Sequence, residues 1–465
     1  MRDTAHRSRR GRTGDDEQRR RHPAQRGRGV APGSLLGRRP GCYSTGKARR
    51  RFEDTPVPTS PLPADGLDSA AAWRRLVVSV LLTTIGGVGM WSVVVVLPAV
   101  QAEFGAARGA AALPYTLTMV GFAFGGVLMG RLADRFGILA PLVLGGICLF
   151  LGYGATALST SLWQFALAHG ILIGLLGSSA AFGPLMADIS LWFARRRGIA
   201  VSVCAAGNYV AGTLWPPLVQ HAVSDFGWRA TQFGIGLFCL ATMLPLALLM
   251  RRRPPVATVE RGGRAGSGGT LGLPPSLLQG LLVVAGLACC VAMSMPQVHI
   301  VAYCGDLGYG VARGAEMLSL MLGFGIVSRI ASGFLADRIG GLPTLLVGSV
   351  LQGVALLLYL AFDGLTSLYV ISALFGLFQG GIVPAYAIIV RELFPASEAG
   401  GRVGVVIMAT LFGMALGGWL SGVIFDLTGS YAAAFANGVG WNLLNVAISL
   451  WLVQRRAGQG RAVPA

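Results

Sequence analysis

One arginine, Arg329, stands inside a long apolar stretch of the sequence, four residues before Gly333. A charged side chain costs free energy to insert into a membrane, so it normally faces a polar cavity and marks a functional site. Arginine suits an anionic ligand because its planar guanidinium can donate two parallel hydrogen bonds to one carboxylate. Arg329 is therefore a candidate anchor for an anion. A structural or gating role near the end of a helix is the alternative that the sequence leaves open.

Other polar or aromatic side chains in apolar stretches could line the same cavity: Tyr115, Asn208, His299, Tyr303 and Gln379. Each of them could equally make a hydrogen bond that packs two helices together. His169 and His299 are candidates for carrying a proton, because histidine titrates near neutral pH. No Asp or Glu stands in the middle of any apolar stretch. The sequence therefore gives little support to proton coupling through a buried carboxylate.

An octapeptide occurs twice, as GRLADRFG at 130–137 and as GFLADRIG at 333–340. Each copy ends a long apolar stretch. A carboxylate such as that of Asp134 or Asp337 is stabilised near the N-terminus of a neighbouring helix, and glycines such as Gly130 and Gly333 let helices approach closely. The two copies indicate an internal duplication.

The elements that carry these residues are predicted by composition and hydropathy. The chain has 465 residues, of which 53% are hydrophobic and 12% charged, and its mean hydropathy is +0.62. A soluble domain carries about a quarter charged residues. Apolar stretches long enough to cross about 30 Å of hydrocarbon recur from residue 75 onward. We predict an all-α polytopic membrane protein with twelve transmembrane helices near 75–99, 111–130, 139–158, 162–187, 198–219, 228–250, 277–300, 314–334, 342–362, 366–389, 402–424 and 432–453.

A charged, Gly- and Pro-containing linker at 251–276 divides these spans into two groups of six. We expect an N-terminal half at 73–250, a C-terminal half at 277–454 and a short tail at 455–465. The octapeptide then closes the second span of each half, so the halves form two six-helix pseudo-repeats.

Residues 1–72 are rich in arginine and contribute much of the net charge of +18. Such a segment cannot bury a core, so we expect a disordered cytoplasmic tail. Contact with nucleic acid or anionic lipid is the weaker alternative, and an upstream start assignment would leave this segment outside the native protein. Within it, GCYSTGK at 41–47 resembles a phosphate-binding loop, but Ala48 follows where such loops have Ser or Thr, and no strand precedes it.

Arginine placement predicts the orientation. With both termini cytoplasmic, only Arg108, Arg229 and Arg313 fall in loops on the outer side. Positive residues favour cytoplasmic loops. We therefore expect a multi-pass protein of the cell inner (plasma) membrane with both ends in the cytoplasm.

Twelve spans in two groups of six, with G-x-L-A-D-R-x-G after the second and eighth spans, resemble the major facilitator superfamily. The resemblance implies that Gly130, Asp134 and Arg135, with their repeats Gly333, Asp337 and Arg338, gate the cytoplasmic side. The stretch WFARRRGIAVSVCAAG at 192–207 resembles a signature of the monocarboxylate-porter and oxalate–formate-antiporter-like branch. It adds Arg196 and Arg197 to the gating candidates. The acidic motif which that branch carries in its first span is missing, since GGVGMW stands at 86–91.

These features predict a secondary transporter of small organic anions, monocarboxylate-like, that works by alternating access. Efflux of apolar or cationic compounds by the same fold is the main alternative; a non-transporting sensor or anchor is a weaker one. No catalytic, cofactor or metal motif is present, so neither an enzyme nor a cofactor is expected. The expected partners are a small-molecule carboxylate, the lipid bilayer and a coupling proton or counter-anion. A functional monomer without nucleic acid is expected.

Overall fold

The computed structural model describes residues 67–193, 195–252 and 271–461. Most of the expected tail at 1–72 and most of the linker at 251–276 lie outside these residues. The regular structure of the described residues is helical throughout, as the composition predicts.

The first set of helices, here the N-terminal set, precedes the linker. It comprises α1 (Ala70–Gly86), α2 (Val88–Phe104), α3 (Arg108–Ala111), α4 (Leu113–Phe136), α5 (Leu139–Ala157), α6 (Leu162–Leu167), a π-helical stretch (Ala168–Gly177), a 3₁₀ turn (Ser178–Ala181), α7 (Gly183–Ser190) and α8 (Arg197–Leu249). The C-terminal set comprises α9 (Pro275–Asp306), α10 (Val311–Ile339), α11 (Gly341–Ala361), α12 (Leu365–Gln379), α13 (Ile382–Leu393), α14 (Ala396–Thr428) and α15 (Tyr431–Arg461).

Eleven helical segments of the described chain are long and apolar enough to cross a membrane. One of them, α8, has 53 residues and contains a break at Gly227, where φ is 77°. Only glycine adopts this backbone conformation without strain. The chain reverses there, because Trp228 bonds to Glu103 at one end of the bundle while Met250 returns to Arg75 at the other. The helix α8 therefore contributes two passes, which correspond to the predicted spans at 198–219 and 228–250.

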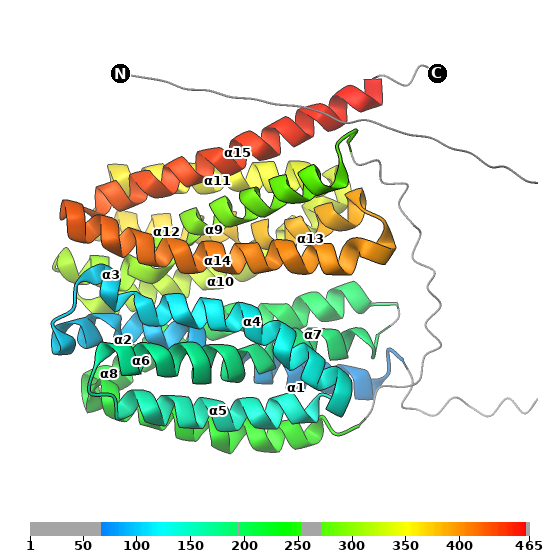
Figure 1. Ribbon diagram of the computed structural model, residues 1–465. Coiled ribbons are helices and arrows are strands. Elements are labelled where there is room, and N and C mark those ends of the chain that lie inside the picture. The colour runs from blue at the N-terminus through cyan, green and yellow to red at the C-terminus, as the bar shows by residue number, and fades with distance from the viewer. Residues whose placement is uncertain (1–66, 194, 253–270, 462–465) are drawn as a thin grey trace, which may run out of the picture. The chain divides into compact units, whose positions relative to one another are not determined.

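The helices run roughly side by side between two ends of the bundle (Figure 1). We call the end that holds the beginning of α1 and the end of α15 the terminal face. The opposite end, which holds α3 and the break at Gly227, is the distal face. Both copies of the octapeptide lie at the terminal face, at the ends of α4 and α10.

The two sets meet where α3 and α4 pack against α14, where α8 packs against α10, and where α2 packs against α9 and α10. Glycines bring helices very close within each set. A β-carbon on Gly376 of α12 would overlap the carbonyl oxygen of Met321 on α10. A β-carbon on Gly121 of α4 would overlap the carbonyl oxygen of Gly170. Small residues allow this backbone contact, which is a main source of helix association in membranes.

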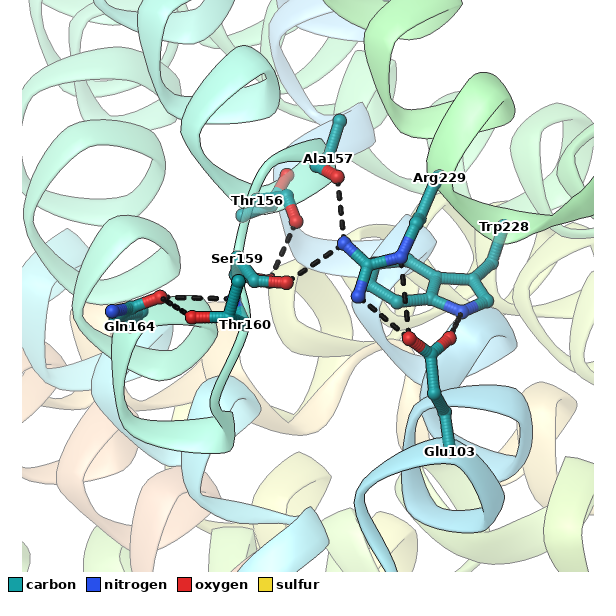
Figure 2. A network of polar contacts seen from close by, with 8 residues as sticks. All are labelled: Glu103, Thr156, Ala157, Ser159, Thr160, Gln164, Trp228 and Arg229. Atoms are coloured by element: carbon teal, nitrogen blue, oxygen red, sulfur yellow. Dashed lines mark hydrogen bonds and ion pairs between the residues drawn. The ribbon is translucent and has the colours of Figure 1, made fainter.

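A polar network braces the N-terminal set at the distal face (Figure 2). The Glu103 carboxylate at the end of α2 accepts hydrogen bonds from Trp228 Nε1 and from Arg229 Nη2, both at 2.6 Å. Arg229 Nη1 also donates to the carbonyls of Ala157 and Ser159, at 2.8 and 2.7 Å. The network therefore joins α2, the end of α5 and the second pass of α8.

Candidate functional site

A cavity of about 310 Å³ lies between the two sets. Its walls come from α2, α4, the 3₁₀ turn, α7, α8, α9, α10, α13 and α14. Most of the lining is apolar, and five methionines contribute to it: Met90, Met186, Met293, Met408 and Met414. Methionine side chains are flexible and polarisable, so such a wall can adapt to apolar bodies of different shape. The lining residues of α4 and α14 include Gly126, Val127 and Gly404, which place the cavity toward the terminal face.

Arg329 projects from α10 to this cavity and is half-buried. It is the one charged residue among the described residues that line it. Its guanidinium carbon lies 4.4 Å from the centre of the Tyr209 ring on α8, a cation–π contact across the two sets.

The hydrogen bonds of Arg329 leave much of its capacity free. Its Nε donates to the carbonyl of Gly380 and its Nη1 to that of Ala205, both at 3.5 Å. This distance is the outer limit for a hydrogen bond, and a guanidinium has five N–H donors. An anion in the cavity could therefore receive two short, charge-assisted hydrogen bonds from Arg329.

Uncharged polar groups complete the wall. Asn208 lines the cavity beside Tyr209, and its backbone carbonyl accepts a 3.2 Å hydrogen bond from Trp91 Nε1. Gln297 of α9 also lines it and donates to Gln379 Oε1 at 2.9 Å. Of the sequence candidates, Arg329 and Asn208 thus reach the cavity directly. Gln379 does not line the cavity, but it accepts a hydrogen bond from Gln297, which does.

The remaining three candidates lie away from the cavity in this structure. Tyr115 is buried against Gly418 where α4 meets α14. His299 Nε2 shares a 2.8 Å hydrogen bond with the carbonyl of Gly418. Tyr303 packs in an aromatic cluster with Tyr431, at 4.8 Å between ring centres. The contacts of all three are those of helix packing.

Sequence reasoning missed several lining residues, among them Trp91, Tyr209 and Gln297. Each of them stands in an apolar stretch as one polar or aromatic residue among many, so only its neighbours in space distinguish it. The described residues contain no group of three His, Cys, Asp or Glu side chains that could hold a metal ion.

At the distal face the two sets are joined by a polar cluster that we call the distal latch: Arg108, Gly109, Asp306, Asp426 and Tyr431. The Asp426 carboxylate of α14 accepts from the backbone N–H groups of Arg108 and Gly109, both at 2.7 Å. Arg108 is 8% exposed and donates from Nη2 to Asp306 of α9 at 2.6 Å. The hydroxyl of Tyr431 donates to the same carboxylate at 2.7 Å. The bonds from Arg108 and Gly109 hold α3 against the C-terminal set.

The octapeptide residues at the terminal face make no comparable connection. Within the described chain, neither Asp134 nor Asp337 makes a hydrogen bond or ion pair, and Arg135 lies over the ring of its neighbour Phe136. Arg338 is exposed in the last turn of α10. Beside Gly130 and Gly333, no other atom lies within 4 Å of the place of a β-carbon. The two sets are therefore joined by hydrogen bonds at the distal face, whereas among the described residues Asp134 and Asp337 make none at the terminal face.

The remaining two gating candidates lie at the start of α8. Arg196 precedes the helix, and its guanidinium carbon lies 6.0 Å from the ring centre of Trp73. Arg197 opens the helix and donates from Nε to the carbonyl of Phe193 at 3.1 Å. Both contacts stay within the N-terminal set.

Comparison with known proteins identifies the family of this arrangement. A family model described as Major Facilitator Superfamily matches residues 79–362 and 317–465. Among curated proteins, monocarboxylate transporter 13 of Bos taurus is 30% identical over 67% of this chain and 73% of its own length. Agnestins efflux protein AgnL12 of Paecilomyces divaricatus is 24% identical over 60% of this chain and 63% of its own length.

Solved structures agree on the fold. The crystal structure of the peptide transporter POT in complex with sulfate superposes with a TM-score of 0.65 at 13% identity, covering 83% of this chain and 95% of the other. At this level of identity the likeness concerns the fold alone.

Proposed function

The chain belongs to the major facilitator superfamily, and on that premise we propose that it carries small organic anions, monocarboxylate-like, across the membrane by alternating access. Membership of this family makes it a multi-pass membrane transporter of a small molecule. The observation that carries the proposed substrate class is Arg329, the single charge among the described residues of the cavity wall.

The cavity chemistry supports a monoanion with an apolar body. A guanidinium in a wall of low polarity attracts an anion more strongly than it would in water. Binding one negative charge beside Arg329 makes the complex of cavity and ligand neutral. This lowers the free energy that is needed to carry the ligand through the membrane. The apolar lining then contacts the rest of the molecule. Asn208 and Gln297 supply further hydrogen-bonding groups.

The alternating access that we propose rests on the difference between the two faces. The distal latch joins the sets on one side, while the cavity lies toward the other side, where Asp134 and Asp337 make no hydrogen bond or ion pair within the described chain. We propose that the terminal face is cytoplasmic, because Arg108, Arg229 and Arg313 are the only arginines of the described chain in its distal loops and helix ends. The structure then corresponds to an inward-facing state in the inner (plasma) membrane.

The test is transport by purified protein in liposomes, with a panel of labelled monocarboxylates and dicarboxylates. The Arg329→Gln variant should bind a transported anion roughly thirty- to several-thousandfold more weakly, since losing a charge partner costs about 2–5 kcal/mol. Arg329→Lys keeps the charge but loses the planar fork, so we expect an intermediate loss. Arg313→Lys, at the distal end of the same helix, is the matched control. Unchanged anion affinity in a folded Arg329→Gln protein would contradict the proposal.

Efflux of apolar or cationic compounds is the second candidate. The methionine-rich wall and the likeness to a protein named as an efflux protein favour it. A cation would meet repulsion from Arg329, so under this alternative Arg329→Gln should increase cation transport instead of abolishing anion binding. The same set of variants therefore separates the two functions.

A further inference from the structure

A second cavity, of about 490 Å³, lies at the terminal face, at the opposite end of the bundle from the distal latch. It is formed by the start of α1, the end of α8 and the segment that follows α7. We call it the basic groove; its lining residues are Ala71, Arg74, Arg75, Val77, Val78, Trp192, Leu249 and Arg252. None of these residues lines the cavity between the two sets.

The wall of the groove carries positively charged side chains. Three arginines and no acidic residue are among the described residues that line it. One of these arginines, Arg75, is paired with Asp188, whose carboxylate accepts from it at 2.7 and 2.9 Å. Arg74 is exposed and has no ion-pair partner among the described residues. The groove is therefore suited to a ligand with a negative charge.

The rim of the groove is apolar. Val77 on α1 is 59% exposed and Leu249 on α8 is 64% exposed. On the next turn of α1, Leu81 is 45% exposed and continues the apolar stripe toward the middle of the membrane. Arginines at the helix end and exposed aliphatic side chains along the span match the two parts of a lipid, whose head group lies at the interface and whose chains lie in the hydrocarbon.

We propose that the basic groove binds an anionic phospholipid, with the phosphate at Arg74 and the acyl chains along Val77 and Leu249. Basic pockets between transmembrane helices on the cytoplasmic side commonly bind such head groups. A free phosphate would meet the same arginines but would leave the apolar rim uncovered, so the structure favours the lipid. The inference does not depend on the transported substrate.

The experiment uses purified full-length protein in neutral detergent and measures retained lipid by native mass spectrometry. The probes are phosphatidylglycerol, phosphatidylcholine and inorganic phosphate. Phosphatidylglycerol should be retained over phosphatidylcholine, and inorganic phosphate should not displace it at equal concentration. Arg74→Gln should weaken phosphatidylglycerol binding about fivefold, the effect of one arginine near a charged lipid. Arg391→Gln, an exposed arginine in the last turn of α13, should leave it unchanged.

A second variant, Val77→Ser with Leu249→Ser, tests the apolar rim. It should weaken phosphatidylglycerol binding while the guanidinium of Arg74 remains in place. Equal retention of phosphatidylcholine, displacement by phosphate alone, or an equal loss in Arg391→Gln would each overturn the proposal. In these outcomes the groove would be, respectively, a nonselective lipid contact, a phosphate site or part of a general positive surface.

Discussion

Removing Asp426 should open the distal face. In the structure its carboxylate accepts two 2.7 Å hydrogen bonds, from Arg108 N and Gly109 N, across the boundary between the two sets. The Asp426→Ala variant removes both hydrogen bonds and leaves the two backbone N–H donors of α3 without their acceptor. States in which the sets separate at this face, and in which water reaches those donors, should become more populated.

The size of this effect follows from the geometry. A hydrogen bond to a charged group contributes about 1.5–3 kcal/mol. Asp426 is exposed, so water competes for its carboxylate. We therefore count its two hydrogen bonds together as contributing the free energy of one such bond. The ratio of distally open to distally closed protein should therefore rise about tenfold to 150-fold. Asp426→Asn keeps one acceptor without the charge and should produce a smaller shift.

The assay is a distance measurement between spin labels on cysteines at positions 158 and 363. Leu158 and Asp363 are exposed at the distal face, one in each set. The cysteines of the described chain are buried, and Cys42, outside it, is replaced by serine. Asp426→Ala should shift the distance distribution toward longer values.

Glu103→Ala is the matched control. Glu103 is also a distal carboxylate with short hydrogen bonds, but its partners Trp228 and Arg229 belong to its own set (Figure 2). Its loss should lower the melting temperature without lengthening the distance between the two labels. An unchanged distribution in a folded Asp426→Ala protein, or the same lengthening in Glu103→Ala, would refute the assignment of the distal latch.

Three further predictions follow from the same structure. Asp134→Asn and Asp337→Asn should slow transport turnover more than they weaken substrate binding, because these groups stand at the terminal face and not in the cavity; an affinity defect with normal turnover would count against this. Cysteines introduced into the linker at 251–276 should react with impermeant reagents only from the cytoplasmic side. Gly376→Ala should cost roughly 1–3 kcal/mol of stability from overpacking against Met321, measured as a lower melting temperature, whereas Gly234→Ala, with open space beside it, should not.

The helical passes could be predicted from the sequence because each depends on local composition. A stretch of about 20 apolar residues satisfies its backbone hydrogen bonds within itself, whatever it later packs against. The prediction of an all-helical polytopic membrane protein of this family is confirmed. Even the reversal within α8 was predictable as two spans, although the structure joins them through the glycine at position 227.

Arg329 was also within reach of sequence reasoning, since a charge in an apolar stretch is conspicuous by itself. Its role as substrate anchor stays a prediction. The stacking on Tyr209 and the weak bonds to two carbonyls could not be anticipated, because they depend on how α8 and α10 meet.

The distal latch could not be predicted from the sequence and is visible only in the tertiary structure. Arg108 is 198 residues from Asp306 and 318 residues from Asp426, and in the sequence it stands as one arginine in a short loop. For the same reason, His299 and Tyr303 seemed equivalent to Asn208 as candidates, although only Asn208 lines the cavity. Hydropathy determines which segments cross the membrane. The rotation and depth of each helix, which set the neighbours of every polar side chain, follow from packing between segments far apart in the chain.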